Sequence, residues 1–407
     1  LITTTGATFT GNIATAGISA VTAGTSNFVA GVNAGNSITS GGNYNTVVGD
    51  EAGTAITTGD NNVAVGYGSL VANTTGSANA AVGLSCLDSN TTGNHNNSLG
   101  YLALYYNTTG SQNTAIGGTA LYSNTTASDN TAVGYTALYA NTTGVRNTAV
   151  GKDSLKANTT GGENTAVGNH SLEANTTGLH NSAFGYSSLA SNTTGQRNTA
   201  VGQNAMLSST TGNYNVAMGF NALDANTTGS QNTSIGDSSM STNTTGVKNI
   251  AVGQAALANN TTGEHNVAIG VDALAANTTG YNNTASGFLA LTSDTTGYDN
   301  VAFGAYSLQA NTTGFDNTSV GKSALYANTT ASYNTAIGRN ALGETTTGAR
   351  NTALGRLAGS TNTTGQYNTF LGYYARGTSV SQENGVVIGY DVVGEGGYTT
   401  LGFGGSD

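Results

Sequence analysis

The chain repeats one pattern of apolar and polar positions every 17 residues. The unit reads N-T-A-V-G-x-x-A-L-x-A-N-T-T-G-x-x, and residues 147–163 are a clean copy. A glycine ends the recurring Asn-Thr-Ala-Val-Gly at every 17-residue step from Gly49 to Gly389, giving 21 glycines with no insertion or deletion between them. A fixed period of this kind indicates a repeat architecture in which each unit packs against its neighbours.

We number the unit from position 1, its first Asn, to position 17. Position 4 is apolar in these units except at Ser286, and position 9 is Leu or Met in the 17 units from Leu70 to Leu342. Position 3 is nearly always Ala or Ser. In a strand, positions 2 and 4 share one face and position 3 faces the other way. The small side chains at position 3 indicate a close neighbour on that side.

The period also predicts the fold class. A 17-residue unit is too short for repeats of paired helices, and each unit has two Gly-containing breaks. We therefore expect an all-β fold, with short strands turned by Gly and Asn-Thr-Thr-Gly corners. The result is a β-solenoid of about 21 coils, one unit per coil. Residues 43–389 would form this shaft, with a Thr- and Gly-rich leader or cap at 1–42 and a C-terminal cap or junction at 390–407.

The two corners of the unit place different demands on their residues. The position 5 glycine never varies, which is expected where φ is positive or another backbone comes close. Position 15 is Ala at Ala127 and Ala331, so that corner is less demanding. The first six turn glycines of position 5 are Gly49, Gly66, Gly83, Gly100, Gly117 and Gly134.

Position 12 is Asn from Asn73 to Asn362, replaced only by Ser209, Asp294 and Thr345. All four residue types hydrogen-bond nearby backbone, so we expect this side chain to cap the turn. Stacked Asn side chains also bond to one another along such a ladder. Rows of small residues at positions 3 and 8 are suited to packing against another chain. We therefore predict a side-by-side homotrimer, in which identical rows meet around a three-fold axis.

The Asn-Thr-Ala-Val-Gly core followed by Ala-Leu resembles the head repeats of trimeric autotransporter adhesins, whose core reads N-S-V-A-I-G; Asn266–Gly270 (NVAIG) comes closest. The resemblance implies a left-handed parallel β-roll in a side-by-side trimer, although the family unit is shorter. The repeat is also similar to phage tail-fibre shafts. In those, a leader such as Gly6–Gly17 and a tail such as Thr399–Gly402 flank the repeat, and the tail can precede a self-cleaving trimerisation chaperone. The terminal residues 405–407 suit such a processed end.

Composition excludes several functions. Only 7% of the residues are charged and the net charge is −10, so we expect no nucleic-acid partner, which would need a basic face. No apolar run is long enough to insert this chain into a membrane. Cys86 is the single cysteine, which excludes an internal disulfide framework, and we expect it to be a small buried filler. Because the chain starts at Leu1 rather than Met, we expect a processed or partial chain.

Few residues are candidates for chemistry. Three of the four histidines, His95, His180 and His265, fall at position 17, where rings in a trimer could bind a metal if they faced the axis. Position 17 also carries Arg146 and Glu163, which indicates a solvated corner, so we predict no metal site. His170 lies at another position and indicates nothing. The acids are scattered, with no insertion to wall a cleft, so we expect neither an enzyme nor a cofactor.

Two surface features remain as candidates. The 15 Asn-Thr-Thr triplets match the N-glycosylation acceptor, but their role as corners explains them without sugar. The adjacent threonines cannot both face out from one flat sheet, which argues against ice binding. Exposed aromatics stack on sugars or anchor partners, and their alternative role is packing between coils or chains. The position 6 candidates for surface recognition are Tyr67, Tyr101, Tyr135 and Tyr186.

These observations predict a structural fibre shaft. Our first hypothesis is a phage tail-fibre shaft in the virion, which holds a distal recognition element for host attachment through a surface receptor or glycan. The alternative is a bacterial trimeric surface adhesin head or a secreted extracellular filament subunit.

Overall fold

The structure, a computed structural model, describes residues 18–19 and 22–403. It divides into two compact units, with the boundary between Thr177 and Gly178. Both units are all-β, and their described residues contain no helix, so none is long and apolar enough to cross a membrane. The predicted β-solenoid with a 17-residue repeat is confirmed. The predictions on the flanking segments rest partly on residues 6–17 and 405–407, which lie outside the described residues, whereas the tail Thr399–Gly402 lies in the strand Thr399–Phe403.

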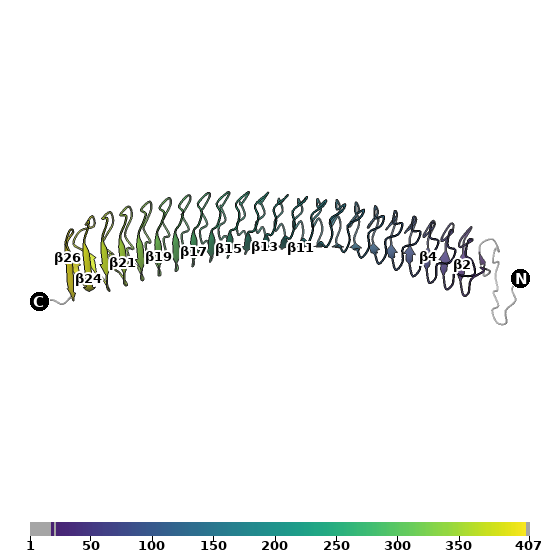
Figure 1. Cartoon of the computed structure of the whole chain (residues 1–407), viewed down its shortest axis with the longest axis horizontal. Coiled ribbons are helices and arrows are strands. Elements are labelled where there is room, and N and C mark those ends of the chain that lie inside the picture. Colours follow the sequence, from purple (N-terminus) through teal and green to yellow (C-terminus); the bar gives the residue numbers. More distant parts are fainter. Residues whose placement is uncertain (1–17, 20–21, 404–407) are drawn as a thin grey trace. The chain divides into compact units, whose positions relative to one another are not determined.

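Unit 1 contains a parallel sheet in which consecutive strands lie side by side (Figure 1). From β3 to β10, each strand pairs with the next in parallel at a 17-residue offset, as in the pairing of Thr148 with Thr165. The pairing of β2 with β3 has an 18-residue offset, and β1 pairs with β2 in the antiparallel sense. The strands are β1 Ile18–Ser19, β2 Phe28–Ala30, β3 Thr46–Val48, β4 Val63–Val65, β5 Ala80–Val82, β6 Asn97–Leu99, β7 Thr114–Ile116, β8 Thr131–Val133, β9 Thr148–Val150 and β10 Thr165–Val167.

Unit 2 has the same kind of coil, with parallel pairing from β11 through β22 to β24 and then β26. A second small parallel pair joins β23 to β25. Counting the strands of position 2 to 4, unit 1 has nine turns and unit 2 has thirteen among the described residues. The strands are β11 Ser182–Phe184, β12 Thr199–Val201, β13 Val216–Met218, β14 Thr233–Ile235, β15 Ile250–Val252, β16 Val267–Ile269, β17 Thr284–Ser286, β18 Val301–Phe303, β19 Thr318–Val320, β20 Thr335–Ile337, β21 Thr352–Leu354, β22 Thr369–Leu371, β23 Arg376–Gly377, β24 Val386–Tyr390, β25 Val393–Gly394 and β26 Thr399–Phe403.

The position 5 glycine ends each three-residue strand. The six turn glycines named above have φ between 127° and 141°, a region that L side chains rarely adopt. A Cβ on any of them would lie 2.4–2.7 Å from a backbone atom of the next turn's glycine. Position 5 therefore combines positive φ with close backbone approach.

Three further positions of a regular coil have positive φ and are occupied by residues other than glycine. In the coil of residues 147–163 they are Asp153 at position 7, Leu155 at position 9 and Glu163 at position 17, with φ of 57°, 49° and 59°. Away from the strand, backbone hydrogen bonds between coils hold this winding path. Leu138 N–H donates to Ser154 O at 3.0 Å, and Thr142 N–H donates to Thr159 O at 2.9 Å. The turns are therefore bonded from coil to coil as the strands are.

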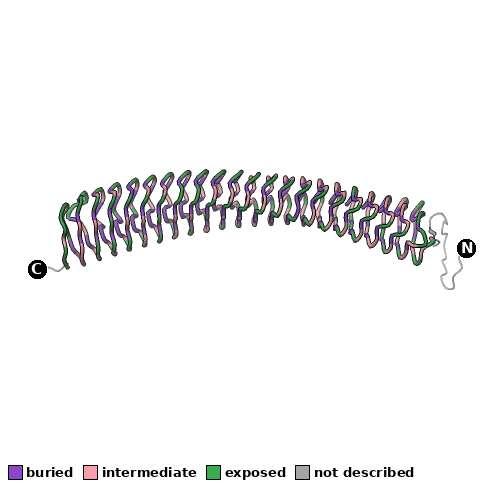
Figure 2. The backbone as a smooth tube through the Cα atoms, in the orientation of Figure 1, coloured by how far each residue is buried: buried purple, intermediate pink, exposed green. Residues whose placement is uncertain are grey.

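The core is a narrow stack of small and medium side chains. Position 3 and position 8 side chains (Ala132 and Ala137 in one coil) and the position 9 leucine (Leu138) are fully buried. Figure 2 shows buried and exposed segments alternating around each coil. The interior is thus filled by ladders of Ala, Ala or Ser, and Leu.

The core changes near the C-terminal end of the repeats. Position 9 is glycine at Gly359, and in the next coil position 3 is the fully buried Phe370 in place of Ala. A Cβ on Gly359 would lie 2.7 Å from Phe370 Cδ2 and 2.7 Å from Leu342 Cδ2. The phenylalanine ring therefore occupies the space that a leucine fills in other coils.

Two ladders of buried asparagines flank this core. At position 12, Asn107 Nδ2 donates to Asn90 Oδ1 at 2.8 Å and to Gly110 O at 2.9 Å, which is the expected ladder and turn cap. The second ladder, at position 1, has a role that sequence reasoning missed. Asn96 N–H donates to Asn79 Oδ1 at 3.0 Å, and Asn96 Nδ2 donates to Gly110 O at 2.9 Å. Buried amides thus join each coil to the one before it.

Candidate functional surfaces

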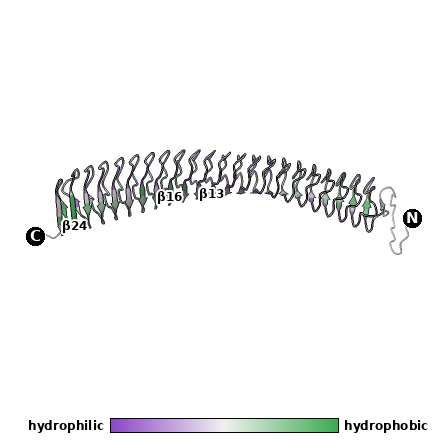
Figure 3. Ribbon diagram, in the orientation of Figure 1, coloured by the Kyte–Doolittle hydropathy of each residue, from purple (hydrophilic) through white to green (hydrophobic). Residues whose placement is uncertain are grey.

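The outer face of the sheet carries mostly apolar side chains at position 4, beside a position 2 that is Thr in most coils and Val or Ile in others. Figure 3 shows hydrophobic residues on the strands, β13, β16 and β24 among them. Exposure reaches 50% at Leu99 and 59% at Phe303. The other exposed members of this row at position 4 are Ile116, Val150, Phe184, Met218, Ile235, Ile269, Ile337, Leu354 and Leu371. We call positions 2 and 4 of all coils the strand face.

The two positions that the sequence predicted to pack against another chain are not on the surface of the coil. We expected the small residues at positions 3 and 8 to meet a second chain, but they are buried inside their own coil; Ala149 and Ser154 are examples. Alanine suits a thin interior as well as an interface, so the residue type did not distinguish the two. Exposed apolar residues in the described coils include the position 4 row of the strand face and position 6 side chains such as Leu84 and Phe288.

The four candidate tyrosines are exposed, as expected of surface residues. Tyr67, Tyr101 and Tyr135 of unit 1 are 57–60% exposed, and Tyr186 of unit 2 is 53% exposed. In unit 1 they recur on every second coil, so they form a spaced row. The Tyr135 ring lies against the neighbouring coil, because a Cβ on Gly118 would be 3.3 Å from Tyr135 Cδ2.

Tyrosines at position 10 stack on one another. The ring centroids of Tyr105 and Tyr122 are 5.5 Å apart, and those of Tyr122 and Tyr139 are 5.1 Å apart with nearly parallel planes. A hydrogen bond with Tyr106, together with burial and the neighbouring phenols, raises the pKa of Tyr122 to about 12. Stacked rings cover one another's faces, so a sugar ring cannot lie on the inner ones. This ladder packs coil against coil.

A second aromatic ladder occupies position 16 in unit 2. Tyr281, Tyr298 and Phe315 stack with centroid separations of 5.0 and 4.7 Å. Cations also lie over rings at the position 17 corner, where the Arg350 guanidinium is 4.9 Å from the Tyr333 centroid and 5.5 Å from that of Tyr367. Inter-coil packing, one of the two roles expected for the aromatics, accounts for these rings.

The position 17 histidines lie on an exposed corner. His95, His180 and His265 are exposed and have φ of 57° to 58°. His265 Nδ1 is 4.0 Å from Glu264 Oε1. Because these histidines are five coils apart, no two of them can share an ion within one chain.

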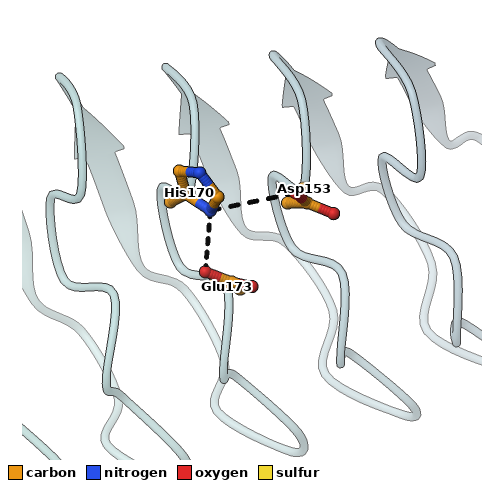
Figure 4. A group of neighbouring side chains, drawn as sticks. All are labelled: Asp153, His170 and Glu173. Atoms are coloured by element: carbon orange, nitrogen blue, oxygen red, sulfur yellow. Dashed lines mark hydrogen bonds and ion pairs between the residues drawn. The ribbon is translucent and has the colours of Figure 1, made fainter.

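His170 belongs to a group of charged side chains that sequence reasoning did not find. His170 Nδ1 lies 2.9 Å from Glu173 Oε2 in its own coil and 3.9 Å from Asp153 Oδ2 in the coil before (Figure 4). Asp153 is buried, and Thr136 Oγ1 donates to its Oδ1 at 2.5 Å. The signal was present in the sequence, because Asp153 and His170 occupy position 7 of consecutive units and are therefore 17 residues apart.

Two lysines complete this group. Lys156 Nζ is 3.0 Å from Asp153 Oδ1, and Lys152 Nζ is 3.6 Å from Asp153 Oδ2. Burial acts to raise the pKa of the Asp153 carboxyl, but hydrogen bonds from Thr136 and Lys156 and the charges of both lysines outweigh it, so the pKa is lowered. The hydrogen bond to Asp153 raises the pKa of Lys156.

The same group offers three donor atoms to a cation. Asp153 Oδ2, His170 Nδ1 and Glu173 Oε2 lie within 4.8 Å of one another. A divalent cation there would have to displace or face the two ammonium groups that already compensate Asp153. The arrangement fits a network of ion pairs that joins two coils better than it fits a metal centre.

Other candidate chemistry is limited. A surface hollow of about 220 Å³ is lined by Ser323, Tyr326, Asn340, Gly343 and Glu344. It contains one carboxylate, whereas glycoside hydrolysis uses a pair. The position 12 asparagines of the Asn-Thr-Thr triplets are buried, and Nδ2 of Asn107 already donates two hydrogen bonds. A glycan on such a nitrogen would require opening of the coil.

Cys86 is fully buried, with its Sγ 2.5 Å from Gly100 O. Burial raises the pKa of its thiol, despite opposing hydrogen bonds, so the reactive thiolate is disfavoured. Its place in the core is that of the Ala or Ser of other coils, the filler role that its position predicted.

Comparison with known proteins adds no assignment. No protein-family model matches the chain, and no curated protein matches it significantly.

Proposed function

We propose that this chain is the shaft of an attachment fibre, and specifically of a phage tail fibre that holds a recognition element away from the virion. The observation that carries the proposal is a solenoid with an uninterrupted 17-residue register whose single long sheet in each unit leaves an apolar face uncovered. Coils bonded to one another along the strand and along the turns suit a spacer.

The shaft would be a homotrimer packed through the strand face. Each three-residue strand presents roughly 50 Å² of sheet, so the thirteen turns of unit 2 alone offer on the order of 650 Å². Stable interfaces bury about 800 Å² per partner. In a trimer with the three-fold axis along the stack, each residue of one chain meets its own copies, and the apolar row would close on itself. Left-handed winding remains part of this prediction.

The oligomeric state is tested by native mass spectrometry of the purified chain. A trimeric mass is expected, and a monomeric mass would reject the trimer. Phe303→Glu is the variant designed to disrupt the trimer, because it would place three carboxylates at one height around the three-fold axis. We expect this variant to lose the trimer. Gln231→Glu, on the exposed position 17 corner, should keep it as a control.

The location is tested separately, by electron microscopy of source material labelled with gold-tagged antibody against the chain. Label on virion tails is expected. Label on cell envelopes would indicate an adhesin head, and label on free filaments would indicate a filament subunit; either result would reject the phage assignment. A host receptor or glycan would then be sought at the distal tip for a phage fibre, or on the tyrosine row for an adhesin.

A further inference from the structure

The position 12 ladder has a fixed direction of hydrogen bonding. Each asparagine donates through Nδ2 to Oδ1 of the preceding coil and to a carbonyl of its own corner. Asn277 Nδ2, for example, donates to Asn260 Oδ1 at 2.7 Å and to Gly280 O at 3.2 Å. Where asparagines follow one another, each Oδ1 in turn accepts from Nδ2 of the next coil. An amide suits this ladder because it carries a donor and an acceptor on one planar group.

Asp294 interrupts the ladder, because a carboxylate has no donor. Its Oδ1 accepts from Asn311 Nδ2 at 2.7 Å, as in any other coil. Its Oδ2 therefore takes the place of the missing Nδ2 and faces the preceding coil. Both Asp294 Oδ2 and Asn277 Oδ1 are buried and lack a hydrogen-bond partner. Asp294 itself is fully buried.

The other breaks in the ladder confirm this direction. Thr345 replaces asparagine after Asn328, and Asn328 Oδ1 is then buried without a partner. Asn362, the last asparagine of the ladder, has the same orphaned Oδ1. The Thr345 hydroxyl donates to Asn362 O of the next coil at 3.1 Å, so it does not donate to Asn328 Oδ1 of the preceding coil. Asp294 differs from these cases because protonation would give it the missing donor.

The groups that act on the Asp294 carboxyl are uncharged. Burial raises its pKa to about 7, against the opposing hydrogen bonds from Asn311 and the Gly297 backbone. Charged or titratable side chains of its own coil and of the two adjacent coils do not contribute to this shift, and Asp299 and Asp316 lie on the exposed position 17 corner. Those side chains are Asp272, Tyr281, Tyr298, Asp299, Tyr306 and Asp316.

We propose that Asp294 is a proton-binding site within the asparagine ladder, where its protonated Oδ2–H donates to Asn277 Oδ1 and restores the chain of hydrogen bonds. The proton comes from solvent, and no other atom is exchanged. Loss of the proton leaves two buried acceptor oxygens facing each other with a negative charge on one of them, which costs more than an unmade neutral hydrogen bond. The coils around Asp294 then open more readily.

The direction of the pH effect follows from linkage. The carboxyl pKa is about 7 in the folded chain and has its ordinary value of 3.8 when unfolded, so the folded state binds more protons between these values. The stabilisation is fully present below about pH 4 and is lost as pH rises through about 7. Since each pKa unit is a factor of ten in population, opening of these coils should increase up to about a thousandfold between pH 4 and pH 8.

The test is native-state hydrogen exchange of the segment 278–311, comparing wild type with Asp294→Asn at each pH so that the intrinsic chemistry cancels. We expect similar protection at pH 4, where the stabilisation is full, and protection in the variant that exceeds wild type by at least tenfold at pH 8.5. Asn260→Asp is the converse variant, which should transfer the same pH dependence to the coils around Asn243. A protection ratio that stays constant from pH 4 to pH 8.5 in the first comparison would overturn the proposal. So would an Asn260→Asp chain whose protection near Asn243 is independent of pH.

Discussion

At the scale of single residues, the fold depends on backbone conformations that most side chains avoid. Every regular coil has a position 5 glycine at φ near 130° and non-glycine residues at positive φ, including position 17. A residue at positive φ costs about 1–2 kcal/mol unless it is Gly, Asn or Asp. This conformational cost opposes the free energy gained by packing, so the residue types at these positions affect the net stability of the fold.

Glycine at position 5 should be irreplaceable, whereas glycine at position 15 should not. We expect Gly134→Ala to lower the free energy of unfolding by at least about 2 kcal/mol, because φ is +141° and the Cβ would lie 2.4 Å from Gly151 O. Gly144→Ala is the matched control, since its φ is not positive and Ala127 and Ala331 occupy that position naturally. Its Cβ would still lie 2.2 Å from Gly161 O, so we expect a smaller cost than at Gly134 rather than none. Denaturant unfolding measures both, and equal costs would contradict this account.

Position 17 gives a second residue-scale prediction. Lys248 is exposed at φ 56°, and no Val, Ile or Thr occupies position 17 in the units from Tyr44 to Asn384. Lys248→Val should destabilise the fold by about 1–2 kcal/mol, and Lys248→Asn should be neutral or stabilising. Thermal unfolding of the two variants checks the prediction. A valine variant as stable as wild type would show that the strain is absent.

At the scale of the coil, the core is a set of ladders whose members compensate one another across neighbouring coils. Phe370 fills the space beside Gly359, and the Asp153, His170 and Lys156 side chains join two coils on the surface. The unit of stability is thus the contact between adjacent coils rather than the coil alone.

An exchange of core residues tests this coupling. Gly359→Leu alone should destabilise the chain by about 1–3 kcal/mol, because the new side chain collides with Phe370. Adding Phe370→Ala should recover most of that loss, since the pair then has the Leu and Ala of a regular coil. A double-mutant cycle of unfolding free energies measures the coupling. Additive effects of the two substitutions would contradict it.

At the scale of the whole molecule, the exact 17-residue register makes coils interchangeable. Removing residues 215–231 takes out one complete coil of unit 2 and should leave β12 to pair directly with β14. We expect a folded chain whose unit is shorter by roughly 4.8 Å. Removing residues 215–223 instead leaves an eight-residue remnant that cannot complete a coil, so the stacking between β12 and β14 is interrupted. Far-ultraviolet circular dichroism and thermal unfolding distinguish the two, and equal stability would argue against a register-based fold.

Much of this architecture could be predicted from the sequence, because recurrence reveals which positions are constrained. The invariant glycines and the position 12 asparagines gave the solenoid, its corners and one amide ladder. Recurrence does not show whether a row of small residues faces the interior of the coil or another chain. For this reason Ala149 is predicted at an interface, whereas it lies in the interior. It also hid the positive φ of Leu155, since leucine is selected there for burial. The 17-residue spacing of Asp153 and His170 carried the signal for their contact, but position 7 varies from unit to unit, so recurrence did not single these residues out.

The hydrogen bonds between coils point along the direction in which the coils stack, and this determines the response of the chain to mechanical force. Tension along the stack breaks the hydrogen bonds of one coil before those of the next. Force across the strands loads the hydrogen bonds of many coils at the same time. Each released coil converts a rise of roughly 4.8 Å into 17 residues of extended chain, roughly 60 Å in length. Such a chain lengthens in discrete steps under load and dissipates work at each one, so it would resist sudden pulling as an extensible tether rather than as a brittle rod.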